Sequence, residues 1–137
     1  MAVEITVTYQ GDLRCEAVHG PSGKRLHTDA PVDNQGKGES FSPTDLVATA
    51  LASCILTTIG IVAKRHGIAF EGATARVEKH MIADPARRIA RLPVVIRVPV
   101  ALDEKQRKLL IHTAETCPVH KSLGAQVELP VSWEWGG

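Results

Sequence analysis

Two cysteines of this chain, Cys54 and Cys117, lie in unlike helical settings and could together carry dithiol redox chemistry. Cys54 lies in the middle of an uncharged stretch that runs from Leu46 to Ala63. Cys117 directly precedes Pro118, and proline favours the first position of a helix. A cysteine beside a helix N-terminus has a lowered thiol pKa, because the exposed N–H groups stabilise the thiolate. If the fold brings the two sulfurs together, one can attack an oxidant and the other can close a disulfide.

Each cysteine also has a simpler interpretation as a packing residue. A free cysteine on an apolar helix behaves as a small hydrophobic side chain, and positions next to a helix cap tolerate cysteine as well. Cys15 alternates with Leu13 and Ala17 in an expected strand, which favours a structural role for it. The combination of Cys54 with Cys117 favours dithiol redox chemistry over two separate packing roles.

Two other site types are weaker alternatives. A zinc site could join Cys117 and His120 to Cys54, His66 or His112, but the sequence has no C-x-x-C pair and no H-E-x-x-H motif. A Cys–His hydrolase would take its histidine from a separate element, and His120 is too close to Cys117 for that geometry. We therefore expect no metal and no bound cofactor, only an external thiol or dithiol reductant.

The composition excludes several classes of protein. The chain has 137 residues, which fits a single domain over residues 1–137 with a sizeable core. Its 16 basic and 15 acidic residues are spread along the sequence, so neither nucleic acid nor a membrane is an expected partner. The N-terminus has neither a charged segment nor an apolar segment of a signal peptide. The small, odd number of cysteines does not suit a secreted disulfide scaffold, and we expect a cytoplasmic location.

The uncharged stretch around Cys54 predicts a buried helix over about 43–66. Serine, threonine and glycine dilute its apolar residues, which argues against a membrane span. Ser42, Pro43 and Asp45 are typical of a helix start, and Gly67 after a cationic turn is typical of a helix end. The apolar residues lie nearly all round this helix, so one small sheet cannot cover them. We therefore expect a homodimer.

The remaining pattern predicts an α+β fold, since the strands come in runs. Alternating residues indicate a hairpin over 3–9 and 13–17 and a strand near 25–28, followed by a polar loop over 31–41. Two strands are expected at about 69–83 and 91–100, then a helix capped by Asp103, a short turn over 118–123, and a last edge strand over 127–135.

These motifs resemble those of the OsmC/Ohr family of organic hydroperoxide-related proteins. The resemblance lies in the run from Ser42 to Cys54, in the helix end at 66–68 and in Cys117-Pro118-Val119, and it extends over nearly the whole chain. It implies an intertwined α+β homodimer, with antiparallel sheets packed on a long central helix and the active sites at the subunit interface. It also implies that Cys54 is the peroxidatic thiol and Cys117 the resolving thiol.

The chain departs from this family at one position. The better-characterised peroxidases have a glutamate where this sequence has Thr44, and that glutamate holds an arginine against the thiolate. Asp45 and Glu39 are possible substitutes for the glutamate, although Asp45 points about 100° away around the helix. For the arginine, Arg25 is the first candidate and Arg14 the second.

The sequence therefore predicts a thiol-dependent peroxidase that reduces organic hydroperoxides through Cys54 and Cys117. A small apolar hydroperoxide and a thiol reductant would be its partners. The alternative is a dimeric module that binds or senses a small apolar ligand with little or no turnover. A cation partner for Cys54 separates the two hypotheses.

Overall fold

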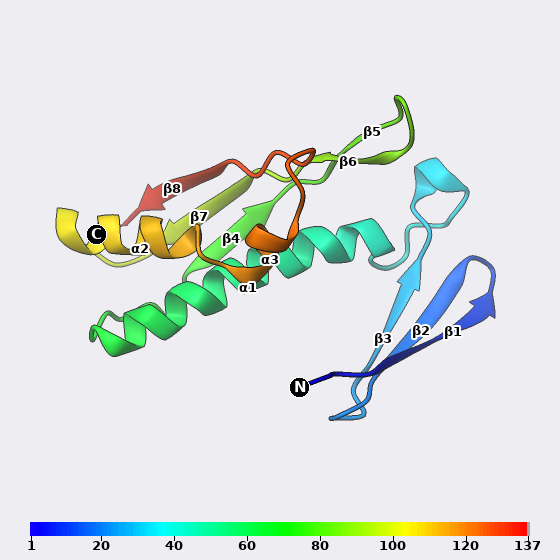
Figure 1. Cartoon of the computed structure of the whole chain (residues 1–137), viewed down its shortest axis with the longest axis horizontal. Helices are drawn as coiled ribbons and strands as arrows, with labels where there is room; N and C mark the ends of the chain where they lie inside the picture. Colours follow the sequence, from blue (N-terminus) through cyan, green and yellow to red (C-terminus); the bar gives the residue numbers. More distant parts are fainter. Residues whose placement is uncertain (137) are drawn as a thin grey trace. The chain divides into compact units, whose positions relative to one another are not determined.

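The computed structural model of the chain describes residues 1–136. The chain forms two compact units, Met1–Leu46 and a second unit that begins at Val47, and each is described here by itself. Strands and helices occur in the order βββ-α-ββββ-αα-β, with a short 3-10 turn before the first helix (Figure 1). The prediction of an α+β fold is confirmed.

The first unit contains a three-stranded antiparallel sheet. Its strands β1 (Ile5–Gly11), β2 (Arg14–His19) and β3 (Arg25–Asp29) pair in sequence order. The tight turn between β1 and β2 places Asp12 and Leu13 at positive φ. The expected loop that follows contains one turn of 3-10 helix, Val32–Asn34.

Helix α1 spans Pro43–Arg65, close to the expected range. At its start, Asp45 accepts a hydrogen bond from the Ser42 N–H and its own N–H donates to Ser42 Oγ, at 2.9 and 3.1 Å. At its end, Gly67 has a φ of 67° and the Ile68 N–H donates to the Ala63 carbonyl, as in a Schellman motif. Both ends therefore follow the local signals of the sequence. The helix is long and apolar enough to cross a membrane, but core helices share these properties and 33% of its most apolar window is already buried.

The second unit is built on a three-stranded sheet in the order β4-β7-β8, formed by Thr74–Val77, Val94–Val98 and Val131–Trp135. Strands β4 and β7 are antiparallel, but β7 and β8 are parallel. The expectation of purely antiparallel sheets is therefore wrong for this sheet. The helices between β7 and β8 form the long crossover that a parallel pair requires.

The strands of this unit are shorter than predicted. The expected strand over 69–83 begins only at Thr74, because residues 70–73 form a turn, and it is divided into β4 and β5 (His80–Ile82). The expected strand over 91–100 is likewise divided at Pro93 into β6 (Arg88–Arg91) and β7. Proline has no N–H to donate to a strand ladder, which explains the break. Strands β5 and β6 form a separate two-stranded sheet.

Two helices connect β7 to β8. Helix α2 spans Glu104–Ala114, and its N-cap Asp103 forms a reciprocal capping box with Gln106. Helix α3 is a short helix, Pro118–Ser122, with Cys117 as its N-cap. The core of the unit joins one face of α1 to one face of the sheet and to α2. Its most buried members are Leu51, Ile55, Ile59, Leu92, Ile96 and Leu110.

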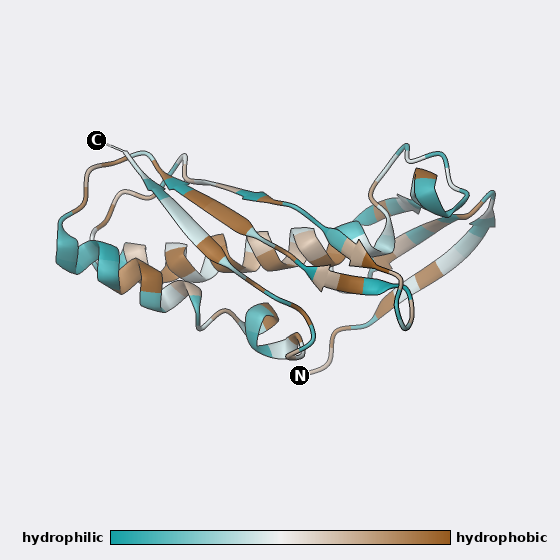
Figure 2. Ribbon diagram, turned by 90° about the horizontal axis from the view of Figure 1, so that it is seen from above, coloured by the Kyte–Doolittle hydropathy of each residue, from teal (hydrophilic) through white to brown (hydrophobic). Residues whose placement is uncertain are grey.

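This arrangement explains how the cysteine-bearing elements are held. Figure 2 shows hydrophobic residues in brown along α1 and β7, and hydrophilic residues in teal at the start of α2. The predicted alternation along residues 92–98 is present, since Leu92, Val94, Ile96 and Val98 are all buried. Strand β7 therefore packs with α1 and α2 in one continuous apolar core. Cys54 lies on α1, and Cys117 follows the end of α2.

Candidate active site

Cys54 lies in the middle of α1, at the edge of the buried face. Its neighbour Ile55 is fully buried in the core, whereas Cys54 is half-buried and packs against the core from one side. The helix backbone holds its position, so the sulfur can move only by rotating about one side-chain bond. Cys54 is thus a rigidly placed thiol that keeps some access to solvent in the single chain.

Cys117 lies at the junction between α2 and α3 and is completely buried, with 0% of its surface exposed. Its sulfur accepts a hydrogen bond from the His120 backbone N–H at 3.3 Å, which makes it the side-chain cap of α3. Pro118 occupies the first helical position and has no N–H, so the first free donors of this turn belong to Val119 and His120. The predicted position beside a helix start is confirmed.

The structure brings the two thiols together. The side chain of Cys117 donates a hydrogen bond to Cys54, and the Val119 N–H also donates to the Cys54 sulfur. One helical turn further along α1, the Thr58 hydroxyl lies 4.0 Å from Cys54 Sγ. All three cysteines of the chain are free thiols, so this is the reduced form of the pair.

The surroundings shift the pKa values of the two thiols in opposite directions. Burial raises the pKa of Cys54, but the hydrogen bonds from Cys117, Val119 and Thr58 outweigh it and leave this pKa below its ordinary value. Burial and the hydrogen bond to Cys54 raise the pKa of Cys117, while the N–H groups of His120 and Val119 act the other way. Of the two thiols, Cys54 therefore loses its proton at the lower pH and is the group disposed to be a thiolate.

Two contributors to this site were not found from the sequence. Thr58 and the Val119 backbone both contact Cys54, and neither was among the candidate site residues, although Val119 lies in the Cys117-Pro118-Val119 motif. Thr58 could have been found, because residues four apart lie on one face of a helix. The Val119 N–H could not, since its contact with Cys54 depends on how α3 packs against α1.

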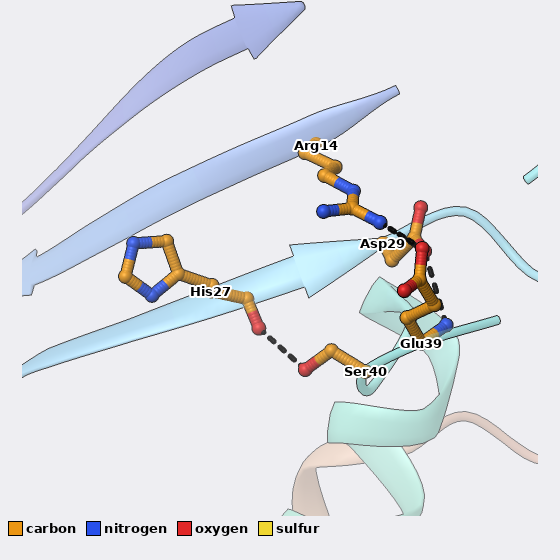
Figure 3. A network of polar contacts seen from close by, with 5 residues as sticks. All are labelled: Arg14, His27, Asp29, Glu39 and Ser40. Carbon is orange, nitrogen blue, oxygen red and sulfur yellow. Dashed lines mark hydrogen bonds and ion pairs between the residues drawn. The ribbon is translucent and has the colours of Figure 1, made fainter. Parts of the chain in front are cut away.

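The polar residues predicted to support the thiolate lie in the first unit, where the structure gives each of them a local partner. Arg14 forms an ion pair with Glu39, and its Nη2 lies 3.6 Å from the carboxylate of the buried Asp29 (Figure 3). The Glu39 N–H also donates to Asp29 at 3.0 Å, which ties the loop to β3. The arginine that meets Glu39 is thus Arg14, the second candidate of the sequence analysis.

Arg25, the first candidate, instead pairs with Glu16 on the neighbouring strand at 2.6 Å, and His27 shares that glutamate. The carboxylate of Asp45 belongs to the start of α1, where it accepts the Ser42 N–H. The support of the thiolate by Arg25, Glu39 or Asp45 stays a prediction.

The remaining candidates lie outside the thiol pair. Cys15 pairs with Tyr9 and Thr28 across the first sheet, in agreement with a position in a strand. His120 contributes its backbone N–H to Cys117. Within residues 1–136 we find no group of three or more His, Cys, Asp or Glu side chains that could hold a metal ion.

The fold and the site together define an α+β protein with a paired-thiol centre. Residues 36–132 match the model of the OsmC-like protein family, and this range is more than half of the chain. The chain therefore belongs to the OsmC-like family. No match was found among curated proteins.

Solved structures agree with this assignment. The chain is 52% identical to a candidate osmotic stress induced and detoxification response protein from Psychrobacter arcticus 273-4, over 95% of this chain and 94% of that chain, with a TM-score of 0.90. It is also similar to an organic hydroperoxide resistance protein OsmC from Legionella pneumophila, with 18% identity, a TM-score of 0.79 and coverage of 98% and 97%. An OsmC-like protein from Mycoplasma pneumoniae gives 19% identity, a TM-score of 0.82 and coverage of 100% and 99%. The last two likenesses show the fold.

Proposed function

We propose that this protein is a thiol-dependent peroxidase that reduces organic hydroperoxides, with Cys54 as the peroxidatic thiol and Cys117 as the resolving thiol. The observation that carries the proposal is the hydrogen bond from Cys117 to a Cys54 sulfur of lowered pKa. A thiolate is the reactive form of cysteine toward peroxides, and a second thiol in contact with it can trap the product. An OsmC-like relative from Legionella pneumophila is described as an organic hydroperoxide resistance protein, which supports the same class of substrate.

The proposed reaction proceeds in two steps. The Cys54 thiolate attacks the terminal oxygen of the hydroperoxide, an S–O bond forms, the O–O bond breaks, and the alcohol is released after protonation. The Cys117 sulfur then attacks the sulfenic sulfur of Cys54, an S–S bond forms, and hydroxide leaves as water. An external thiol or dithiol returns two electrons and restores both thiols.

The apolar surroundings of Cys54 support an organic substrate. Cys54 packs against the hydrophobic core, and burial of an alkyl chain contributes about 0.8 kcal/mol per CH2 group. We expect a bulky alkyl or aryl hydroperoxide to oxidise the protein at least about tenfold faster than hydrogen peroxide, since apolar contacts beside Cys54 add binding energy only for the former. Rapid-mixing measurements with both oxidants test this, and equal rates would identify Cys54 as merely an accessible thiol.

The mechanism itself is tested by intact mass after one equivalent of cumene hydroperoxide. The wild-type subunit should lose about 2 Da, since two S–H hydrogens leave as the disulfide forms. Cys54→Ser should not react, because the nucleophile is gone. Cys117→Ser should be oxidised to the Cys54 sulfenic acid by the first equivalent, and a second equivalent should take it to the sulfinic acid, because no thiol traps the sulfenic acid.

Cys54→Ser and Cys117→Ser must therefore differ in their products: the first stays unoxidised and the second is oxidised at Cys54. If they behaved alike, or if the wild type gained oxygen and kept its hydrogens, the two-cysteine mechanism would be wrong. The protein would then be assigned to the other predicted class, a module that binds or senses a small apolar ligand.

We further propose that the protein acts as a homodimer in the cytoplasm. The dimer accounts for the apolar side chains that a single chain leaves exposed, such as Ile61 on α1 at 51% exposure. A reducing compartment accounts for three free cysteines and a site that cycles between thiol and disulfide.

A further inference from the structure

Thr58 lies where it can contact a substrate that approaches the Cys54 sulfur. It follows Cys54 by four residues on α1, so the two side chains share one face of the helix, and Thr58 Oγ1 is 4.0 Å from Cys54 Sγ. Both residues are half-buried and keep some exposed surface in the single chain. A small molecule that reaches the sulfur therefore meets this hydroxyl beside it.

The separation of these two atoms leaves room for one oxygen atom in contact with both. An oxygen poised for attack lies about 3.3 Å from the attacking atom, and a hydroxyl lies about 2.8 Å from the oxygen to which it hydrogen-bonds. An oxygen at both distances fits a sulfur and a hydroxyl oxygen that are 4.0 Å apart, and its two contacts are then close to a right angle. The hydroxyl would thus approach from the side and leave the line of attack open.

We propose that Thr58 is a catalytic residue whose hydroxyl binds the terminal oxygen of the hydroperoxide and holds it in line with the Cys54 thiolate. This role rests on the proposed function and adds a contact with the substrate to it. Fixing the reacting oxygen beside the sulfur accelerates the attack, because the reacting atoms no longer have to find their orientation by chance.

Thr58 fits this role better than the other groups that contact the Cys54 sulfur. The side chain of Cys117 has no exposed surface, so a substrate oxygen cannot reach it. The Thr58 hydroxyl can turn its hydrogen from the sulfur to an oxygen atom, because it rotates about its C–O bond. Its lone pairs can also accept the O–H of the terminal oxygen, which the Val119 N–H cannot do.

Thr58 keeps its own proton in this step. The Cys54 thiolate forms an S–O bond to the terminal oxygen, the O–O bond breaks, and its electron pair leaves on the alkoxide, which takes a proton from water. The sulfur loses two electrons and the peroxide gains two. The transferred oxygen becomes the sulfenic oxygen. The hydroxyl therefore acts by position and hydrogen bonding, with no change in its own bonds.

The test compares an oxidant with an alkylating agent at the same sulfur. Cumene hydroperoxide presents a terminal oxygen to Cys54, whereas iodoacetamide presents a carbon atom and has no peroxide oxygen for Thr58 to hold. Single-turnover rates with both reagents are measured for the wild type and Thr58→Val, at a pH where ultraviolet absorbance shows Cys54 to be ionised in each. In Thr58→Val, the ratio of the oxidation rate to the alkylation rate should fall about tenfold, as expected when a transition state loses one hydrogen bond.

Three comparisons complete the test. Thr58→Ser keeps the hydroxyl and should restore most of the wild-type ratio. Thr57→Val alters an exposed side chain that points about 100° away from Thr58 around the helix, and it should leave the ratio unchanged. Hydrogen peroxide carries the same terminal O–H as cumene hydroperoxide, so Thr58→Val should slow its reaction by about the same factor. Thermal unfolding of each variant verifies that the fold is retained.

The possible failures are distinguishable. An unchanged ratio in Thr58→Val would overturn the role of Thr58, because a hydroxyl that acts only on the sulfur or only on packing affects both reagents alike. A wild-type protein that is alkylated at Cys54 but is not oxidised by cumene hydroperoxide would instead overturn the proposed peroxidase function itself.

Discussion

At the scale of single residues, the two sulfurs differ in the hydrogen bonds that they make. Cys54 accepts from a thiol, a backbone N–H and a hydroxyl, so its thiolate is stabilised despite burial. Cys117 donates to Cys54 and is fully buried, and both features raise its pKa. Environments that separate two pKa values assign different chemical roles to groups of the same type, and here they make Cys54 the nucleophile.

Thr58 provides a test of this separation. Replacing it with valine removes one donor to the Cys54 sulfur with little change in shape, so the pKa of Cys54 should rise. A group with a raised pKa loses its thiolate at a higher pH as the solution is acidified. The rate of alkylation of Cys54 by iodoacetamide, followed by mass spectrometry of its peptide, should therefore reach half its maximum at a higher pH than in the wild type.

The neighbouring Thr57 offers a matched control. Its side chain is exposed and points about 100° away from that of Thr58 around the helix, so Thr57→Val should leave the pH profile of Cys54 unchanged. Thr58→Ser keeps the hydroxyl and should restore most of the wild-type profile. Identical profiles for Thr57→Val and Thr58→Val would show that the Thr58 hydroxyl does not act on the sulfur.

At the scale of elements, the site forms where one turn of α1 packs against the first turn of α3. Helix α1 supplies Cys54 and Thr58 from one face, and α3 supplies the Val119 and His120 N–H groups because Pro118 has none to offer. Helix α2 ends only a few residues before Cys117, so its placement decides where that sulfur lies. The stability of α2 is therefore coupled to the geometry of the thiol pair.

The capping box of α2 gives a prediction at this scale. Asp103→Ala removes the side chain that accepts the Gln106 N–H at 2.8 Å and should lower the free energy of unfolding by about 1 kcal/mol. Urea denaturation measures the change. Glu104→Ala is the control, since its ion pair with Lys108 is exposed and such pairs contribute no more than about 0.5 kcal/mol. Equal losses in the two variants would mean that the cap adds nothing specific.

At the scale of the whole molecule, apolar surface remains exposed on both units. In the first unit, the strand β1 exposes Ile5, Val7 and Tyr9, each by more than half of its surface. In the second unit, α1 exposes Ile61. Soluble proteins rarely leave apolar patches of this kind uncovered, which is the physical basis for the proposed dimer.

We expect sedimentation to show a dimer at micromolar concentration that separates only when the protein unfolds. Ile61→Glu places a charge in the apolar surface of α1 and should shift the protein toward monomer or toward unfolding. A wild-type chain that sediments as a folded monomer at that concentration would contradict the dimer.

The sequence by itself determined the features that depend on near neighbours. The ends of α1 followed from Ser42, Asp45 and Gly67, and the start of α2 followed from Asp103, because capping groups lie within a few residues of the backbone they satisfy. The buried face of β7 followed from alternation along 92–98, because side chains of a strand point to opposite sides in turn. The two cysteines were recognised for the same reason, from the helical setting of each.

The tertiary structure alone decided what lies far apart in the sequence. It joined Cys54 to Cys117, added the Val119 N–H, set β8 parallel to β7, and paired Glu39 with Arg14 where the sequence favoured Arg25. No local preference encodes these contacts, because each depends on which elements pack together and in what register. The direction of each thiol's pKa shift belongs to the same group, since burial and hydrogen-bond partners exist only once the chain is folded.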